Sequence, residues 1–316
     1  MLGFSEWLSL VLSVTQFIVG ILGNSFIGLV NGSSWFKSRR ISMSDFLITN
    51  LAVSRIVLLW IFFIDGLLIV FSYSTHDSGI MMQIVDIFWT FINQFSIWLA
   101  TCLHVLYCLK IATFPHTAFL WLKWRASRVV GWMLLGALLF ACGSTMSLIN
   151  EFKIYSVLNE IGDSENMTEV AQKKKGEYEV MHVLMSLWYS PALFLSLTAC
   201  ALLILSLGRH TRQMQQNGVI PGDQSSEAHK KAIRLIFSFL FLFLLYFLAF
   251  LILSSSYFLP ETKKVKMVGE IITMSSPTVH SFILILWNNK LKQTFMEMLR
   301  CESCHLKCGS KVCCFP

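Results

Sequence analysis

Seven stretches of this sequence are each long and apolar enough to cross a lipid bilayer as a helix. The hydrocarbon core of a bilayer is about 30 Å thick, and about 20 helical residues span it. The stretches cover residues 7–30, 45–70, 80–111, 127–150, 181–207, 231–254 and 267–287. Several of these runs are far longer than a helix in a soluble core requires. We therefore predict an all-α membrane protein built as a seven-transmembrane helix bundle.

The composition excludes several classes of soluble protein. Of the 316 residues, 55% are hydrophobic and only 14% are charged, whereas about 25% of residues are charged in an ordinary soluble domain. These values exclude a soluble enzyme, a disordered scaffold and a nucleic-acid-binding protein. The net charge of +7 suits a membrane surface. The lipid bilayer is therefore an expected partner, and nucleic acid is not.

Catalytic motifs are absent from the sequence. It contains no H-E-x-x-H, no G-x-S-x-G and no Gly-rich phosphate loop, and the spans hold no pair of His residues with metal-ligand spacing. The seventh span has no central lysine, which excludes a retinal Schiff base. We expect neither an enzyme nor a bound cofactor or metal.

Basic residues predict the orientation of the bundle. Most Lys and Arg residues fall in or beside the connections 31–44, 112–126 and 208–230 and in the C-terminal segment, and loops rich in these residues face the cytosol. The N-terminus is then outside, where the first run acts as a signal anchor, and the C-terminus is cytosolic. The sequon at Asn166 lies in the longest external connection and is a glycan acceptor, whereas the sequon at Asn31 lies on the cytosolic side and stays unmodified.

The nine cysteines are divided between the predicted spans and the C-terminal tail. None is expected outside the cell, so no external disulfide is predicted. We divide the chain into a bundle domain at 1–299, which ends in a short cytosolic helix, and a Cys-rich tail at 300–316. Cys301 and Cys304 of the tail are candidates for palmitoylation beside the bilayer. The alternatives are an inert tail and a zinc site that also uses His305 and Cys308.

Ionisable side chains at membrane depth mark functional sites or polar networks, because they are expensive to bury in lipid. The predicted spans contain Arg55, Asp65, Asp86, His104, Glu270 and His280. Positions 86, 89, 90 and 93 share one helical face in the outer half of the third span. Asp86, Trp89 and Asn93 on this face could line a cavity open to the outside. The alternative is an aromatic packing stripe with Asn93 bonded to a neighbouring helix.

Two other positions have open interpretations. Glu270, at the outer end of the seventh span, either reaches the same cavity or is solvated at the interface. Arg55, in the inner half of the second span, requires partners, and Asn24, His280 and Ser281 are suitable. We interpret this group as a structural polar knot that can also serve as a switch. Pro191 and Pro277 are expected to kink the fifth and seventh spans.

Short segments of the spans have a recognisable order and spacing. They are residues 23–27 (GNSFI), 51–55 (LAVSR), 98–101 (WLAT), 109–112 (LKIA), 122–125 (LKWR), 210–214 (HTRQM), 228–230 (AHK) and 280–284 (HSFIL). With these segments, essentially the whole chain resembles the vertebrate bitter taste receptors of type two. The rhodopsin-class motifs D-R-Y, C-W-x-P and N-P-x-x-Y are absent, as in that family. One departure is Trp287, which stands where the family usually has Gly and is expected to alter the turn into the cytosolic helix 290–299.

The resemblance implies a G-protein-coupled receptor of the plasma membrane that is activated by bitter small molecules. In similar receptors the agonist cavity lies among spans three, five, six and seven. On matching positions this implies that Trp89, Asn93, Tyr246 and Glu270 contact the agonist, and Asp86 shares their helical face.

The resemblance also implies a partner, the gustducin type of heterotrimeric G protein, whose activation leads to calcium release. The residues expected to face it are Lys110, Lys123, Arg125, His210, Arg212 and Met214. The basic residues among them have a simpler explanation in the general cytosolic bias of Lys and Arg. A pheromone-type or orphan chemoreceptor is the alternative among receptors. A transporter is the alternative outside them, although it would require duplicated halves, and no internal repeat is visible.

Overall fold

The computed structural model describes residues 3–38, 41–71, 80–162, 186–216, 237–238, 240–252 and 262–307. Within these ranges the chain is helical and contains no strand. The helices are α1 (Phe4–Ser38), α2 (Met43–Phe71), α4 (Ile80–Ile111), α5 (Thr117–Trp124), α6 (Ala126–Gly162), the short 3₁₀ turn η1 (Ser186–Tyr189), α8 (Ser190–Gln216), α10 (Thr262–Trp287) and α11 (Asn289–Lys307). A further apolar helix, Leu240–Ile252, precedes α10.

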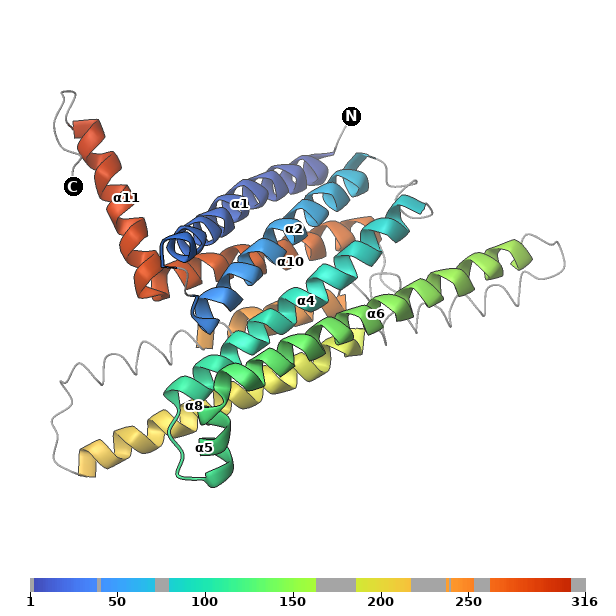
Figure 1. The fold of residues 1–316 in the computed structure, drawn as a ribbon. Helices are drawn as coiled ribbons and strands as arrows, with labels where there is room; N and C mark the ends of the chain where they lie inside the picture. Colours follow the sequence, from blue (N-terminus) through green and yellow to red (C-terminus); the bar gives the residue numbers. More distant parts are fainter. Residues whose placement is uncertain are drawn as a thin grey trace.

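Six of the described helices are long and apolar enough to cross a membrane. They correspond to the predicted spans one to five and seven, and Leu240–Ile252 falls within the predicted sixth span, 231–254. The long helices run side by side (Figure 1). The predicted all-α bundle is therefore confirmed.

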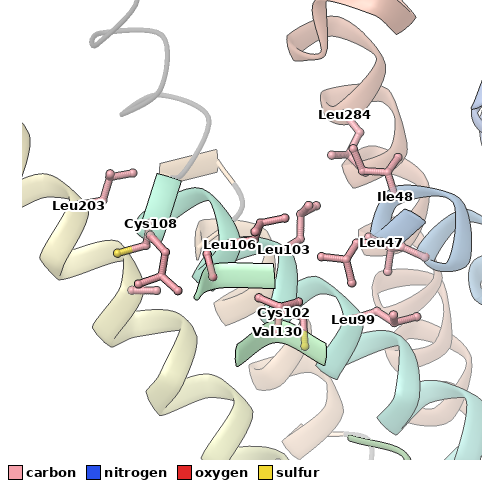
Figure 2. Close-up of a cluster of buried hydrophobic side chains, with 14 of the residues drawn as sticks. Leu47, Ile48, Leu99, Cys102, Leu103, Leu106, Cys108, Val130, Leu203 and Leu284 are labelled. Atoms are coloured by element: carbon pink, nitrogen blue, oxygen red, sulfur yellow. The ribbon is translucent and has the colours of Figure 1, made fainter. Parts of the chain in front are cut away.

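Helix α4 lies at the centre of the bundle. It contacts α2, α6 and α8, while α1 packs against α2 and α10. The largest buried cluster surrounds α4, where Leu103 and Leu106 have no exposed surface. Figure 2 shows these residues between Leu47 of α2 and Leu203 of α8. This core fixes the relative positions of the helices that carry the polar residues of the site.

The outer surface of the bundle is apolar, as a lipid-facing surface must be. Leu22 and Leu29 of α1 are 65% and 73% exposed, and Leu139 of α6 and Phe194 of α8 are each 66% exposed. Because water does not favour contact with large apolar side chains, these exposures fit a hydrocarbon environment. The chain is a multi-pass membrane protein.

Two details differ from the sequence predictions. Residues 117–124, expected to be part of a loop, form α5. The described part of the fifth span begins with η1 and continues as α8 from Ser190, and residues 181–185 lie outside the described ranges. Pro191 is the second residue of α8 and does not kink it, because a helix needs no backbone donor in its first turn. Pro277 does lie inside α10.

The ends of the last two helices also differ from expectation. Helix α10 begins at Thr262, so Lys263, Lys264 and Lys266 lie in its first turns and not in a loop. The cytosolic helix expected at 290–299 is α11, which continues to Lys307. The backbone breaks between α10 and α11 at Asn288, whose side-chain oxygen accepts hydrogen bonds from the backbone N–H groups of Lys290 (3.1 Å) and Leu291 (3.3 Å). This N-cap follows Trp287 directly, so the indole does not prevent the turn.

Candidate functional site

Asn93 of α4 connects three elements at the level of the predicted cavity. Its amide nitrogen donates a hydrogen bond of 3.2 Å to the hydroxyl of Tyr189, the last residue of η1. Its amide oxygen accepts a hydrogen bond from the hydroxyl of Tyr246 in the helix Leu240–Ile252. Asn93, Tyr189 and Tyr246 are 1%, 4% and 6% exposed. A ligand could therefore reach the Asn93 amide only if a tyrosine hydroxyl gave way.

Aromatic rings surround this hydrogen-bonded group. Trp89 lies about one turn before Asn93 on α4 and stacks on Phe250, with ring centroids 5.4 Å apart. The edge of Phe62 from α2 approaches Trp89 at 6.4 Å, and Tyr189 packs edge-on against Phe250 at 4.7 Å. The indole N–H of Trp89 is buried and has no hydrogen-bond partner in the described part of the chain. Trp89 therefore presents a flat apolar face with one available donor.

The structure thus brings together three of the residues expected at the cavity, namely Trp89, Asn93 and Tyr246. Trp89 is half-buried, unlike the sealed Asn93. The connections 72–79, 163–185 and 253–261 lie outside the described residues, so the opening of a cavity at this end stays a prediction. Asp86, about one turn before Trp89, is partly exposed.

Glu270 lies in the contact between α10 and α2. Its side chain is 4% exposed, and its carboxylate packs on Gly66 of α2, where a methyl group in place of the glycine hydrogen would lie 3.0 Å from Glu270 Oε1. Asp65 is close enough to interact electrostatically with Glu270. Lys266, one turn earlier on α10, is also buried at 6% exposure. The burial of Lys266 beside these acids was not predicted, because the predicted seventh span, 267–287, begins after Lys266.

Arg55 belongs to a second polar group, which joins α1, α2 and α10. Its Nη1 atom donates a hydrogen bond of 3.4 Å to Ser281 Oγ. Ser281 Oγ in turn lies 2.7 Å from Asn24 Oδ1 and 2.8 Å from the carbonyl oxygen of Pro277, toward which its hydroxyl can donate. His280 is buried beside them and interacts electrostatically with Arg55. The structure therefore brings Asn24, Arg55, His280 and Ser281 into one region.

A third polar group joins α4 and α8 and was not predicted from the sequence. The hydroxyls of Thr101 and Ser196 lie 3.0 Å apart, and Ser196 Oγ is 3.2 Å from His104 Nδ1. Beside them lies a small cavity of about 10 Å³, which Cys200, Leu203 and Leu240 also line. Such a volume is about what one water molecule needs. Because Leu240 comes from the sixth span, this cavity lies where spans three, five and six meet.

The residues expected to face a G protein are not equivalent in the structure. Lys110 and Arg212 are exposed near the ends of α4 and α8. Lys123 Nζ donates a hydrogen bond of 2.8 Å to the carbonyl oxygen of Ala112, and the guanidinium of Arg125 lies 4.9 Å from the ring centroid of Trp121. His210 and Met214 lie on α8, but their side chains are outside the described set.

The predicted modification sites fall largely outside the described residues. Asn166 lies in the connection 163–185, and the side chains of Cys301 and Cys304 on α11 are likewise not described. Asn31 is described and is 1% exposed, and its side-chain oxygen accepts a hydrogen bond of 3.1 Å from Lys290 Nζ. The described cysteines, Cys102, Cys108, Cys142 and Cys200, form no disulfide.

Comparison with known proteins identifies similar sequences. A family model described as "Taste receptor protein (TAS2R)" matches residues 1–303. Taste receptor type 2 member 3 of Homo sapiens is 65% identical over 311 residues, which cover 98% of each chain. The proteins of the same name from Mus musculus and Rattus norvegicus are 62% and 63% identical, again over 98% of each chain.

Proposed function

Because this chain belongs to the taste receptor (TAS2R) family, we propose that it is a plasma-membrane receptor that binds bitter-tasting small molecules and activates a G protein. The family is one of receptors, so the expectation that the chain is not an enzyme is confirmed. We further propose that the N-terminus is extracellular, that Asn166 carries a glycan, and that Cys301 and Cys304 are palmitoylated.

The observation that carries the proposed binding site is the pair of hydrogen bonds from Asn93 to Tyr189 and Tyr246. These bonds link the third span to the start of the fifth and to the sixth, which are the elements that a receptor must move to change its cytosolic end. A small molecule that stacks on Trp89 and bonds to the Asn93 amide would compete with the tyrosine hydroxyls. It would therefore favour an arrangement in which the spans have separated.

The polar groups between spans provide a route from this site to the opposite end. The Thr101–Ser196–His104 group lies further along α4 and α8, next to Leu240. A small cavity beside polar side chains leaves room for this contact to rearrange when the sixth span shifts. We propose that the exposed ends of α4 and α8, with Lys110 and Arg212, then accept a gustducin-type G protein, which leads to calcium release.

Glu270 and Asp86 have a secondary place in this proposal. Glu270 is packed against Gly66 of α2, so its carboxylate contacts an agonist only if α2 and α10 separate. Asp86 is partly exposed on the same face of α4 as Trp89, and it would attract cationic agonists toward that face. We therefore expect Trp89 and Asn93 to contribute to all agonists and the two acids only to cationic ones.

The test is calcium release in cells that express this chain together with a gustducin-like Gα chimera. Diverse bitter compounds are applied at high micromolar concentration, with the chimera present or omitted. A response that requires the chimera is expected, and Trp89→Ala should raise the half-maximal agonist concentration roughly tenfold, because stacking on an indole contributes about 1 kcal/mol or more. Trp60→Ala is the matched control, since Trp60 is 50% exposed on the outer surface of α2.

Three outcomes would contradict parts of the proposal. A response that does not change in Trp89→Ala at equal surface expression would contradict the binding site but not the receptor function. Silence toward every compound, with surface delivery shown, would favour a narrowly tuned or orphan chemoreceptor. A response without any Gα chimera or endogenous Gα of this class would contradict the proposed coupling.

A further inference from the structure

Helix α5 is fixed by one of its faces to the connection that follows α4. Phe119 is buried and packs edge-on against Phe114, with ring centroids 5.1 Å apart. Lys123 Nζ donates a 2.8 Å hydrogen bond to the carbonyl oxygen of Ala112. These contacts determine which side of α5 points away from the bundle.

The opposite side of α5 carries two exposed tryptophans and an arginine. Trp121 is 55% exposed and Trp124 is 92% exposed. Arg125 is exposed, and its guanidinium lies 4.9 Å from the ring centroid of Trp121. A guanidinium over an indole face is held in place by cation–π attraction, while its N–H groups stay free to bind an anion.

This surface continues through Arg125 to the start of α6. Arg125 lies between the two helices and caps α6, because the backbone N–H groups of Arg128 and Val129 both donate hydrogen bonds of 2.9 Å to its carbonyl oxygen. Arg128 is exposed and Trp132 is 69% exposed. Arg128 and Trp132 are four residues apart and share one side of α6, and Arg125, which contacts Trp121, lies at the start of the same helix. We call Trp121, Trp124, Arg125, Arg128 and Trp132 the Trp–Arg face.

The position of the Trp–Arg face indicates what covers it. Beyond Trp132, the exposed residues of α6 include Leu135, 48% exposed, and Leu139, 66% exposed, which belong to the hydrocarbon-facing surface. The Trp–Arg face therefore lies where the apolar surface of α6 ends and the polar headgroup layer begins. Tryptophan is enriched at this depth, and guanidinium groups bind phosphate in a bidentate manner.

We propose that the Trp–Arg face binds the headgroup phosphate of an acidic phospholipid, with Arg125 and Arg128 as ligands and the indoles at the level of the lipid ester groups. In this assignment Arg125 binds lipid, whereas the family resemblance implied that it faces a G protein. It also explains why Trp124 is almost fully exposed, since lipid and not water surrounds it. In the orientation proposed above, the lipid belongs to the cytosolic leaflet, which is rich in acidic lipids.

The test counts the lipids that stay bound to the purified receptor. The protein is prepared in mixed micelles with equal amounts of phosphatidylserine and phosphatidylcholine, and native mass spectrometry measures the adducts of each lipid. The wild type should retain phosphatidylserine preferentially. The R125Q/R128Q variant should lose this preference by roughly fivefold for each arginine removed, and Trp124→Ala should reduce it without changing the charge.

Matched controls distinguish a specific lipid-binding site from a general attraction of acidic lipids to positively charged side chains. The R209Q/K292Q variant removes two exposed cations from the same end of the bundle and should retain the wild-type preference. An equal loss of the phosphatidylserine preference in both double variants would overturn the proposal, because any exposed cation would then account for that preference. Unchanged lipid retention in R125Q/R128Q, combined with weaker G-protein assembly in phosphatidylcholine nanodiscs, would also overturn it and assign the face to protein. Because adducts in micelles do not depend on topology or agonist, failure here leaves the proposed function untouched.

Discussion

Single polar residues in this bundle form hydrogen bonds with more than one neighbouring group. Ser281 of α10 accepts a hydrogen bond from Arg55 and lies within donating distance of Asn24 and the Pro277 carbonyl. Removing its hydroxyl leaves a buried arginine and a buried amide each short of a partner. We expect Ser281→Ala to reduce the free energy of unfolding by about 1–3 kcal/mol, measured as a lower thermal unfolding midpoint of purified protein. Ser275→Ala, at a half-buried serine of the same helix whose hydroxyl donates to the Ile272 carbonyl oxygen within that helix, should shift the midpoint little.

The Asn93 group gives a residue-scale prediction with a definite sign. If the tyrosine bonds to Asn93 hold the resting arrangement, Tyr246→Phe removes one of them and frees an acceptor for the agonist. The ligand-free protein should lose about 1–3 kcal/mol of stability, and the half-maximal agonist concentration should fall up to about tenfold, as measured by calcium release. A rise in that concentration would instead show that the Tyr246 hydroxyl contacts the agonist directly. Tyr107→Phe provides a control at a tyrosine of the inner part of α4.

At the scale of elements, the position of α1 depends on one close approach. A methyl group on Gly20 would lie 2.7 Å from Leu59 Cδ1 of α2 and 2.7 Å from Thr278 Oγ1 of α10, whereas one on Gly28 would meet nothing within 4 Å. Gly20→Ala should therefore force α1 away from both neighbours and destabilise the receptor by about 1–3 kcal/mol. Gly28→Ala should leave stability unchanged or raise it by up to about 1 kcal/mol. Equal unfolding midpoints for the two variants would contradict this packing argument.

The elements also show how far the sequence is informative. A span is predictable because apolar length is a requirement of each helix by itself. Asn93 could be singled out because an amide within a span needs a partner. Its partner Tyr189 could not be singled out, because that tyrosine lies in a short 3₁₀ turn and no local sequence pattern indicates that it contacts α4. The contact of Glu270 with Gly66 could not be predicted for the same reason, since Gly66 has no side chain by which a pattern could reveal the contact, and the sequence left Glu270 open between the cavity and the interface. Helix α5 is too short to show a reliable period.

At the scale of the whole molecule, the arrangement of the ends agrees with the charge pattern. Helix α1 begins, and α6 ends, at one end of the bundle, whereas α5 and α11 lie at the other (Figure 1). The second end also carries Lys110, Arg125 and Arg128. Bundles with basic residues at one end tend to cross a membrane with that end in the cytosol, which supports the proposed orientation, with the connection 163–185 outside.

This orientation predicts which of the two sequons is glycosylated. Thr168→Ala removes the sequon of Asn166 and should abolish the mobility shift that peptide N-glycosidase causes on gel electrophoresis, because Asn166 is on the lumenal side during synthesis. Ser33→Ala removes the sequon of Asn31 and should leave the shift unchanged. Ser33 is exposed and bonds only within its own helix, to Val30, so this control leaves the buried contact between Asn31 and Lys290 intact. A shift that persists in Thr168→Ala and disappears in Ser33→Ala would show the reverse orientation, with the Trp–Arg face on the outer side of the membrane.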